Sequence, residues 1–381
     1  MPRIYLDHAA TTPVDEAVAR AMVAVLESGY GNPSSVHAPG REARQRMSEA
    51  REKVAQLLGA RPEEIVFTSG GTEADNLALV GVARACRERG DHIVTTQVEH
   101  HAVLETCRAL EAEGFRTTYV PVDHQGRVAP EAVAEALTPR TVLVSVMLAN
   151  NEVGTLQPVA RIADLVRSRG VYLHTDAVQA VGQVPVGVEE LGVDLLSLSA
   201  HKMYGPKGVG ALYVRRGVPL SPLLHGGGQE RGRRSGTENV PGIVGLGKAA
   251  QMAHSEQPER QRGLTALRER LIRGIAARAP EAILNGHPTQ RLPSNVSISF
   301  PGVTGEALVV DLDLKGVAIS AGAACAAGTV EPSHVLRAMG LSEQVAAGTV
   351  RLSLGRANTP EEVDQVLDIL TEAVERLRQA S

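Results

Sequence analysis

The chain has 381 residues, a formal net charge of −4 and a hydrophobic content of 43%. These values predict a soluble protein with either one large domain and a smaller companion or two domains of middling size. The slightly acidic balance argues against nucleic-acid binding, and no apolar stretch reaches the roughly 20 residues that a membrane span needs. Three widely separated cysteines and an N-terminus without a signal-peptide core favour a reducing cytoplasm.

Helical and strand-like segments alternate through the first two thirds of the chain. Amphipathic spacing predicts a helix over residues 42–58, ended by Gly59, and a second helix from residue 73 to about residue 89. Shorter helices are expected near 130–137 and 159–169. β-rich runs occur at 64–68, 92–96, 117–120, 141–147, 171–175, 194–198 and 209–214. Apolar strands separated by helices predict a largely parallel α/β sheet, which binds ligands at the carboxyl ends of its strands.

The pattern of predicted helices and strands changes near Glu256. A charged helix is expected over 259–277, strands over 294–300, 317–320 and 349–354, and helices over 333–339 and 360–380. This pattern predicts a smaller α+β domain of residues 257–381, joined by residues 1–14. Residues 15–256 then form the large domain.

A lysine stands at the end of one apolar strand. The run 195–199 ends in Ser199-Ala-His201-Lys202, and a glycine-rich segment follows. The chain has only five lysines, so a lysine behind a buried strand favours amine chemistry, such as a Schiff base with a phosphorylated aldehyde cofactor. Ser199 and His201 could donate to the phosphate. The alternative is a strand-end lysine that reaches solvent.

Polar groups also follow other strands. Thr68-Ser-Gly-Gly-Thr72 opens a helix and could cradle an anion, although such a turn is often only a helix cap. Asp176, at another strand end, could keep a pyridine nitrogen protonated, or cap a helix. Asn150-Asn151 is suited to hydrogen-bonding a ligand, or is a plain turn. His100 could lie over a flat ring; the adjacent pair with His101 points apart, which disfavours a metal site.

Taken in order, the motifs resemble those of cysteine desulfurases of the NifS/IscS type, within the fold-type I pyridoxal phosphate enzymes of the class V aminotransferase family. The resemblance covers essentially the whole chain. It is carried by 5–13 (YLDHAATTP), 31–35 (GNPSS), 68–73 (TSGGTE), 99–100 (EH), 150–154 (NNEVG), 176–179 (DAVQ), 199–202 (SAHK), 225–237 (HGGGQERGRRSGT) and 351–356 (RLSLGR). It implies a large domain with a mostly parallel seven-stranded sheet, a smaller α+β domain, and pyridoxal 5′-phosphate as cofactor.

The resemblance also implies residue roles. Lys202 would bind the cofactor as a Schiff base, His100 would stack on its ring and move protons, Asp176 would pair with the ring nitrogen, and Gln179 would bond the phenolic oxygen. The phosphate would be held by Gly71, Thr72, Ser199 and His201, with Thr237 from the neighbouring subunit of a homodimer. Asn151 would contact cofactor and substrate. Asn32 and Arg351 would bind the substrate, Arg351 through its α-carboxylate.

Cys325 decides which reaction is expected. It stands alone among alanines and glycines in 320–328, a segment with few bulky anchors, and a movable thiol is predicted there. The alternative is a buried cysteine that packs as a small apolar residue, which is the interpretation adopted for Cys86 and Cys107. By resemblance, L-cysteine becomes L-alanine and its sulfur stays on Cys325 as a persulfide.

The sulfur would then pass to an acceptor such as an iron–sulfur scaffold protein. No resident metal is expected, although Cys325 would contact an iron–sulfur cluster during transfer. Two departures from relatives stand out: alanines flank Cys325 where serine and threonine are common, and the C-terminal tail is short. Rival interpretations are a selenocysteine lyase or aminotransferase on the same site, and an inactive sulfur-carrier subunit. The presence of both Lys202 and Asp176 disfavours the inactive subunit.

Overall fold

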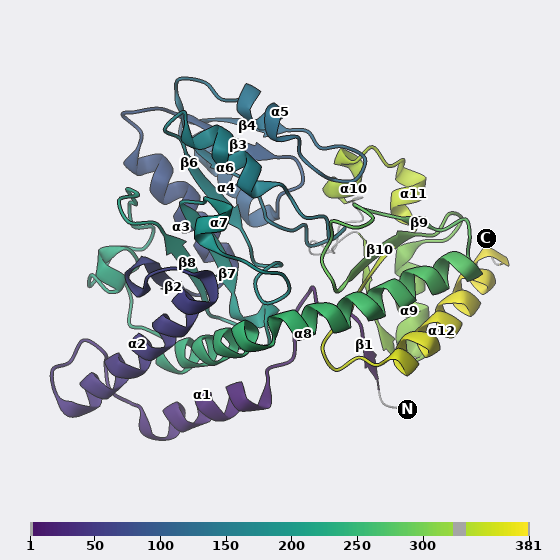
Figure 1. Cartoon of the computed structure of the whole chain (residues 1–381), viewed down its shortest axis with the longest axis horizontal. Coiled ribbons are helices and arrows are strands. Elements are labelled where there is room, and N and C mark those ends of the chain that lie inside the picture. The colour runs from purple at the N-terminus through teal and green to yellow at the C-terminus, as the bar shows by residue number, and fades with distance from the viewer. Residues whose placement is uncertain (1–2, 323–332, 380–381) are drawn as a thin grey trace.

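The computed structural model describes residues 3–322 and 333–379 (Figure 1). Its main feature is a seven-stranded sheet in the order β2-β8-β7-β6-β5-β3-β4. The strands are β2 (Ile65–Thr68), β3 (His92–Thr96), β4 (Arg116–Val120), β5 (Thr141–Ser145), β6 (Tyr172–Asp176), β7 (Leu195–Ser199) and β8 (Gly210–Val214). Strand β8 runs opposite to the other six strands, which all point the same way. The expected mostly parallel α/β sheet is therefore confirmed.

Helices cover both faces of this sheet. One face packs on α2 (Ala38–Leu58), α6 (Val159–Arg167) and the first half of α8 (Val240–Arg278), and the other packs on α3 (Gly71–Ala85) and α4 (His101–Ala112). Helices α1 (Glu16–Ser28), α5 (Pro130–Glu135) and α7 (Val188–Leu191) contribute smaller parts of the first face, through the buried side chains of Val18, Val25, Val133 and Val188. Burial from both sides explains the mostly apolar sequences of β5, β7 and β8.

A second, four-stranded sheet has the order β12-β13-β10-β9 and lies at the right of Figure 1. Its strands are β9 (Ile283–Leu284), β10 (Asn295–Ser299), β12 (Ser320–Ala321) and β13 (Thr349–Ser353). It shares a separate apolar core with α9 (Gly305–Leu314), α12 (Pro360–Gln379) and the second half of α8. The short helices α10 (His334–Ala338) and α11 (Glu343–Ala347) flank it.

The first residues of the chain belong to this second layer. Strand β1 (Ile4–Tyr5) pairs in parallel with β11 (Val317–Ala318), and both Ile4 and Leu6 are buried in its core. Beyond β1 the chain crosses toward the larger sheet, where the Thr12 backbone N–H donates to the carbonyl of His201. The N-terminal segment thus links the two layers.

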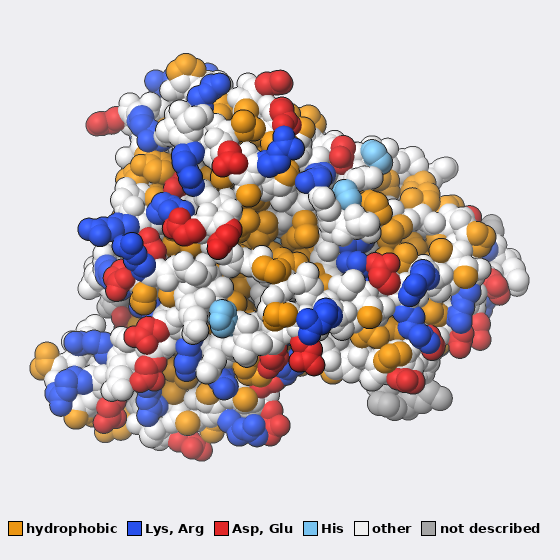
Figure 2. Space-filling model, viewed as in Figure 1, with side chains coloured by type: hydrophobic (Ala, Val, Ile, Leu, Met, Phe, Trp, Pro, Cys, Tyr) orange, Lys and Arg blue, Asp and Glu red, His pale blue; other side chains and the backbone are white. Residues whose placement is uncertain are grey.

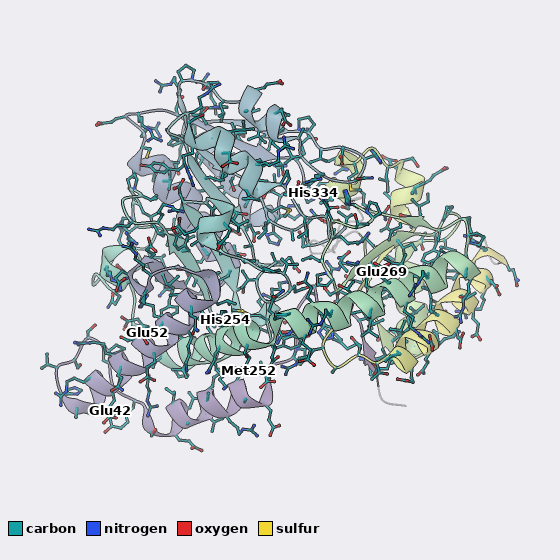
Figure 3. The ribbon with its side chains drawn as sticks, in the orientation of Figure 1. Glu42, Glu52, Met252, His254, Glu269 and His334 are labelled. Atoms are coloured by element: carbon teal, nitrogen blue, oxygen red, sulfur yellow. The ribbon has the colours of Figure 1, made fainter. Side chains whose placement is uncertain are left out.

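Helix α8 differs from the sequence expectation. A helix over 259–277 was expected, but α8 begins at Val240, capped by Asn239, and runs without interruption through Pro258 to Arg278. Figure 3 shows its course, with Met252 and His254 beside the larger sheet and Glu269 beside the smaller one. Both halves of α8 bury an apolar stripe, one in each core, so packing outweighs the hydrogen bond that a proline removes.

Other expected elements differ from the structure mainly at their ends. The second predicted helix ends at Ala85 rather than near residue 89, and the single strand expected over 317–320 is divided into β11 and β12. Gly59 ends α2 in a left-handed conformation with φ 65°, as its position predicted. Cys86 and Cys107 are buried, as expected for structural cysteines.

The surface carries mixed charge. On the face shown in Figure 2, acidic and basic side chains are interspersed, without a broad field of one sign. Within 3–322 and 333–379, no helix combines the length and the apolar character that crossing a membrane requires.

Candidate active site

A cavity of about 370 Å³ opens where the larger sheet, the N-terminal segment and the smaller sheet meet. Most of its walls come from residues at the carboxyl ends of β5, β6 and β7 and from the start of α3. Its lining consists of Ala9, Ala10, Gly71, Thr72, Asp75, His100, Met147, Ala149, Asn151, Asp176, Val178, Gln179, Ser199, His201, Lys202, Ser320 and Arg351.

Lys202 supplies the amine of this cavity. It ends a short 3₁₀ turn (Ala200–Lys202) directly after β7, and its Nζ donates to the carbonyls of Ala9 at 2.5 Å and Ala10 at 2.8 Å. Burial lowers the pKa of this ammonium to about 8, and the charge of Arg351 acts in the same direction. A lysine with a lowered pKa gains a larger fraction of the neutral, nucleophilic amine near neutral pH.

The turn after Lys202 is held in a strained conformation. Tyr204 has a φ of 67°, which is costly for a residue with a side chain. Its ring lies under the guanidinium groups of Arg260 and Arg356, at 5.1 and 4.5 Å. Its hydroxyl accepts from the Arg356 backbone N–H, and its own N–H donates to Thr12. These contacts fix the backbone that carries Lys202.

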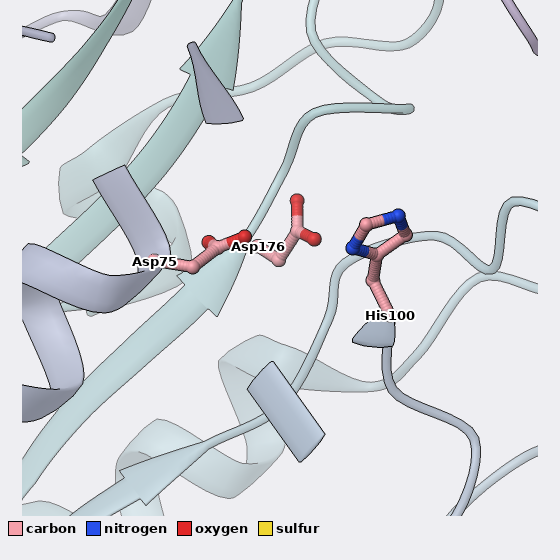
Figure 4. Close-up of side chains that lie close together, drawn as sticks. All are labelled: Asp75, His100 and Asp176. Carbon is pink, nitrogen blue, oxygen red and sulfur yellow. The ribbon is translucent and has the colours of Figure 1, made fainter. Parts of the chain in front are cut away.

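Asp176 and His100 face each other across the cavity floor (Figure 4). Asp176, at the end of β6, accepts from the backbone N–H of Val178 and is buried, and this burial raises the pKa of its carboxyl. His100 caps α4, and its Nδ1 accepts from the backbone N–H of Ala102. Desolvation lowers the pKa of the imidazole, so the neutral ring carries its proton on Nε2.

Glu99, the residue before His100, holds the surrounding backbone in place through several hydrogen bonds. It is fully buried, accepts from the Thr96 hydroxyl and from the Met147 backbone N–H, and burial raises its pKa to about 8. The carbonyl of Glu99 also accepts from His334 Nε2 at 2.9 Å. Figure 3 shows His334 at the start of α10, so this bond ties the His100 turn to the smaller layer.

One end of the cavity is suited to an anion. Gly71 and Thr72 form the first turn of α3, where backbone N–H groups point outward, and Ser199 and His201 line the same cavity. A Cβ on Gly71 would lie 2.7 Å from a methyl carbon of Val178, so only glycine allows this close approach. Hydroxyl, imidazole and helix N-terminus form a donor set that fits a phosphate.

The opposite wall carries Arg351, which comes from the middle of β13 in the smaller sheet. Its Nη1 donates to the carbonyl of Asn151 at 2.9 Å and its Nη2 donates to Asp7 Oδ1 at 3.0 Å. Its Nε–H is buried and has no hydrogen-bond partner within the described part of the chain. A guanidinium held on two sides with a free donor is arranged to bind a carboxylate.

Most of the site residues expected from the sequence meet in this cavity. Those that line it are Gly71, Thr72, His100, Asn151, Asp176, Gln179, Ser199, His201, Lys202 and Arg351. Asn32 and Thr237 are exposed and do not line it. Cys325 lies outside the described residues.

Sequence reasoning missed several lining groups. Asp75 stands in the first turns of α3, three positions after Thr72, and an acid at that place in a phosphate-binding helix was a usable signal. The carbonyls of Ala9 and Ala10 and the carboxylate of Asp7 reach the site from the far end of the chain. No local pattern indicates such long-range contacts.

Comparison with known proteins places this geometry in a family. The Aminotransferase class-V family model matches residues 4–366. A cysteine desulfurase IscS of Methanosarcina thermophila is 51% identical over 378 residues, covering 99% of this chain and 93% of the relative. The cysteine desulfurase of Mus musculus is 48% identical, covering 99% of this chain and 83% of the relative.

Solved structures agree. A NifS-like protein superposes with a TM-score of 0.92 at 44% identity, covering 98% of this chain and 100% of that one. A structure of SspA in complex with cysteine superposes with a TM-score of 0.81 at 38% identity, covering 92% of this chain and 98% of that one. Fold and sequence therefore point to the same family.

Proposed function

Because the chain belongs to the class-V aminotransferase family, we propose that it is a cysteine desulfurase that uses pyridoxal 5′-phosphate. The observation that carries the proposal is the set of groups in one cavity: an amine of lowered pKa, a buried carboxylate and an anion-binding helix start. Relatives named cysteine desulfurase, about half identical over the full chain, support it.

The residues present fit this cofactor. Lys202 would hold its aldehyde carbon, Asp176 its ring nitrogen and Gln179 its phenolic oxygen. Gly71, Thr72, Ser199 and His201 would hold the phosphate, and His100 would cover the ring. When bound, the cofactor supplies an electron sink that weakens bonds at the substrate's α- and β-carbons.

Proton transfers fall to two residues of the chain. Lys202 Nζ is the base of the cavity, and its lowered pKa suits it to take and return the substrate's α-proton near neutral pH. The backbone N–H of Ala102 occupies Nδ1 of His100, which leaves Nε2–H as the proton available near the substrate's sulfur.

Arg351 would bind the substrate's α-carboxylate. The bond to the Asn151 carbonyl and the ion pair with Asp7 fix the guanidinium plane, and the Nε–H, which has no partner among the described residues, is left to bind a carboxylate oxygen. This arrangement, and the cysteine in the complex of the structural neighbour SspA, support L-cysteine as substrate.

Cys325 would accept the sulfur. Its thiolate would form an S–S bond with the sulfur of cysteine while the C–S bond of the substrate breaks, and the carbon would gain a proton to give L-alanine. The sulfur would remain as a persulfide and pass to an acceptor such as an iron–sulfur scaffold protein. This role rests on the sequence and on the family.

We also propose a homodimer located in the cytoplasm. Several large apolar side chains are exposed on α1 and on the segment that follows it: Val23, Leu26, Tyr30 and Val36. A second copy covering this surface would bury them. Thr237, which is exposed here, would then reach the neighbouring cavity. The division at about Glu256 stays a proposal, supported by the two separate cores.

The deciding experiment is a visible spectrum of the purified protein with and without L-cysteine, read together with the alanine produced. We expect absorbance of a lysine-bound cofactor, a change on adding cysteine, and one alanine for each sulfur released under reducing conditions. A colourless protein that gains no absorbance from added pyridoxal phosphate would contradict the cofactor. Turnover that survives Cys325→Ala would favour an aminotransferase or a lyase.

A further inference from the structure

Asp75 is a buried acid that the mechanism above does not use. It lies in α3, only 1% of its surface is exposed, and it belongs to the lining of the cavity. Its Oδ1 is buried and has no hydrogen-bond partner within the described residues. Burying a charged carboxylate without a positively charged partner costs free energy. The protonation state of Asp75 therefore needs an explanation.

Three other titratable groups, Asp176, His100 and His174, share its surroundings. Single ligand atoms of Asp75, Asp176 and His100 all lie within 4.8 Å of one another, and Figure 4 shows the two carboxyl groups side by side. On the other side, His174 Nε2 lies 3.6 Å from Asp75 Oδ1. Burial lowers the pKa of His174 to about 3, so this imidazole is neutral and does not balance a charge on Asp75.

Neighbouring charges favour ionisation of Asp176 rather than Asp75. Asp176 accepts a backbone hydrogen bond from Val178 and faces the positive charge of Lys202. Asp75 has burial, the Asp176 carboxylate and the more distant Glu99 acting against its ionisation, and these outweigh the Ser197 hydroxyl, which favours it. No arginine or lysine of the described part of the chain forms an ion pair with Asp75. Two adjacent acids in such a site hold one proton between them.

We propose that Asp75 is a positioning residue that remains a neutral carboxylic acid and donates a hydrogen bond to the carboxylate of Asp176. This bond would keep the single negative charge of the pair on Asp176, aimed at the ring nitrogen of the cofactor. This inference rests on the proposed function in one respect only, which is the contact of Asp176 with the ring nitrogen of the cofactor. The shared proton is a property of the protein itself.

The alternative explanation for the cluster of Asp75, Asp176 and His100 is a bound metal ion. The amine of Lys202 and the guanidinium of Arg351 line the same cavity, and their positive charge opposes a cation there. A neutral Asp75 also explains the unpaired oxygen without a bound ion.

The first test is made on the protein without cofactor. Infrared difference spectra between wild type and Asp75→Asn at pH 7 should show the loss of one carbonyl band of a protonated carboxylic acid. Asn76→Ala, a neighbouring change on α3, should leave that band in place. Loss of a carboxylate band in Asp75→Asn would overturn the proposal, whether or not the protein binds pyridoxal phosphate.

The second test separates positioning from simple packing. Asparagine keeps a neutral donor, whereas leucine has a similar shape and no donor. We expect the cofactor dissociation constant of Asp75→Asn to stay within about threefold of wild type, and that of Asp75→Leu to rise roughly tenfold or more. Equal dissociation constants in both variants would overturn the proposal.

Should Asp75→Leu fail to fold, a second pair of variants is compared in the same way. Asp75→Ser keeps a hydrogen-bond donor, and Asp75→Ala lacks one. Thermal unfolding of the cofactor-free variants separates weaker binding from weaker folding. If wild type itself binds no pyridoxal phosphate, the proposed function fails, while the infrared result still decides the protonation of Asp75.

Discussion

The two sides of the cavity are built in different ways. On the larger-sheet side, Asp176 and Ser199 end the neighbouring parallel strands β6 and β7, and Lys202 lies in the turn directly after β7, so each is positioned by its strand. On the smaller-sheet side, Arg351 comes from a single antiparallel strand and is oriented by Asp7 and Asn151, which are distant in sequence. The first side is specified locally and the second by long-range contacts, so we expect them to respond differently to substitution.

The largest effect is expected on the larger-sheet side, from Lys202→Ala. Removal of the amine should abolish the visible absorbance of the bound cofactor and lower turnover by roughly a thousandfold or more, with the fold intact. Absorbance spectroscopy and an alanine assay measure both. Lys207→Ala, at an exposed lysine in the following loop, is the matched control and should behave as wild type.

Cys325→Ser tests the sulfur transfer that the sequence and the family assign to Cys325, a residue outside the described part of the chain. The cofactor and cysteine should bind as in wild type, because Lys202, Asp176 and Arg351 are unchanged, but almost no alanine should be released, since a hydroxyl does not accept sulfur at a useful rate. Mass spectrometry of wild type after cysteine treatment should find added sulfur on Cys325 and none on Cys86 or Cys107. Undiminished alanine release would contradict the persulfide route.

Arg351→Lys should separate substrate binding from cofactor binding. Lysine keeps the charge but loses the planar fork, so KM for cysteine should rise roughly tenfold to a hundredfold while the cofactor spectrum is unchanged. Arg273→Lys, at an exposed position on α8, is the control. A loss of cofactor absorbance in Arg351→Lys would mean that the two sides are not independent.

Glu230→Gln tests an ion pair that anchors the glycine-rich segment 225–237 to the larger-sheet side. Glu230 is buried, pairs with Arg51 through both carboxylate oxygens, and accepts from the Phe67 backbone N–H. Breaking this buried pair should lower the free energy of unfolding by about 3 kcal/mol. The matched change Glu131→Gln breaks an exposed pair with Arg161 and should cost about 0.5 kcal/mol or less, as measured by denaturant titration.

The last prediction is a pH dependence of stability set by Lys202. Its pKa is about 8 in the folded protein and 10.5 as a free side chain. The unfolded state therefore binds more protons between these values, so the free energy of unfolding should rise with pH across this window relative to Lys202→Met. Denaturant titrations of both cofactor-free proteins from pH 7 to 10.5 measure the difference. A constant difference would show that Lys202 titrates as an exposed lysine.

Sequence reasoning predicted the locally specified side better than the other. Alternating strands and helices predicted the parallel sheet, and the edge where Asp176 and Lys202 meet followed from it, because carboxyl ends of parallel strands share one edge. Arg351 was expected from family resemblance alone. Its contact with Asp7 spans 344 positions, and no periodicity carries such information.

Packing explains the remaining differences. The pattern near Pro258 suggests the start of a helix, and only the two cores on either side of α8 show why the helix continues through it. Asp75 looks like an ordinary charged residue near the start of a helix. Its unusual surroundings follow from the packing of α3 against β6 and β7, which a single sequence does not display.

Because β1 pairs with β11, the N-terminal residues reach their final position only after a late part of the chain has been synthesised. All strands of the larger sheet have been synthesised once residue 214 has emerged. The carbonyls that bind Lys202 belong to Ala9 and Ala10, however, and Ser353 accepts from the backbone N–H of Ala9. Ala9 and Ala10, among the first residues synthesised, are therefore fixed in place only once residues near Ser353 are available. Completion of the cavity is a post-translational event, however early the larger sheet forms.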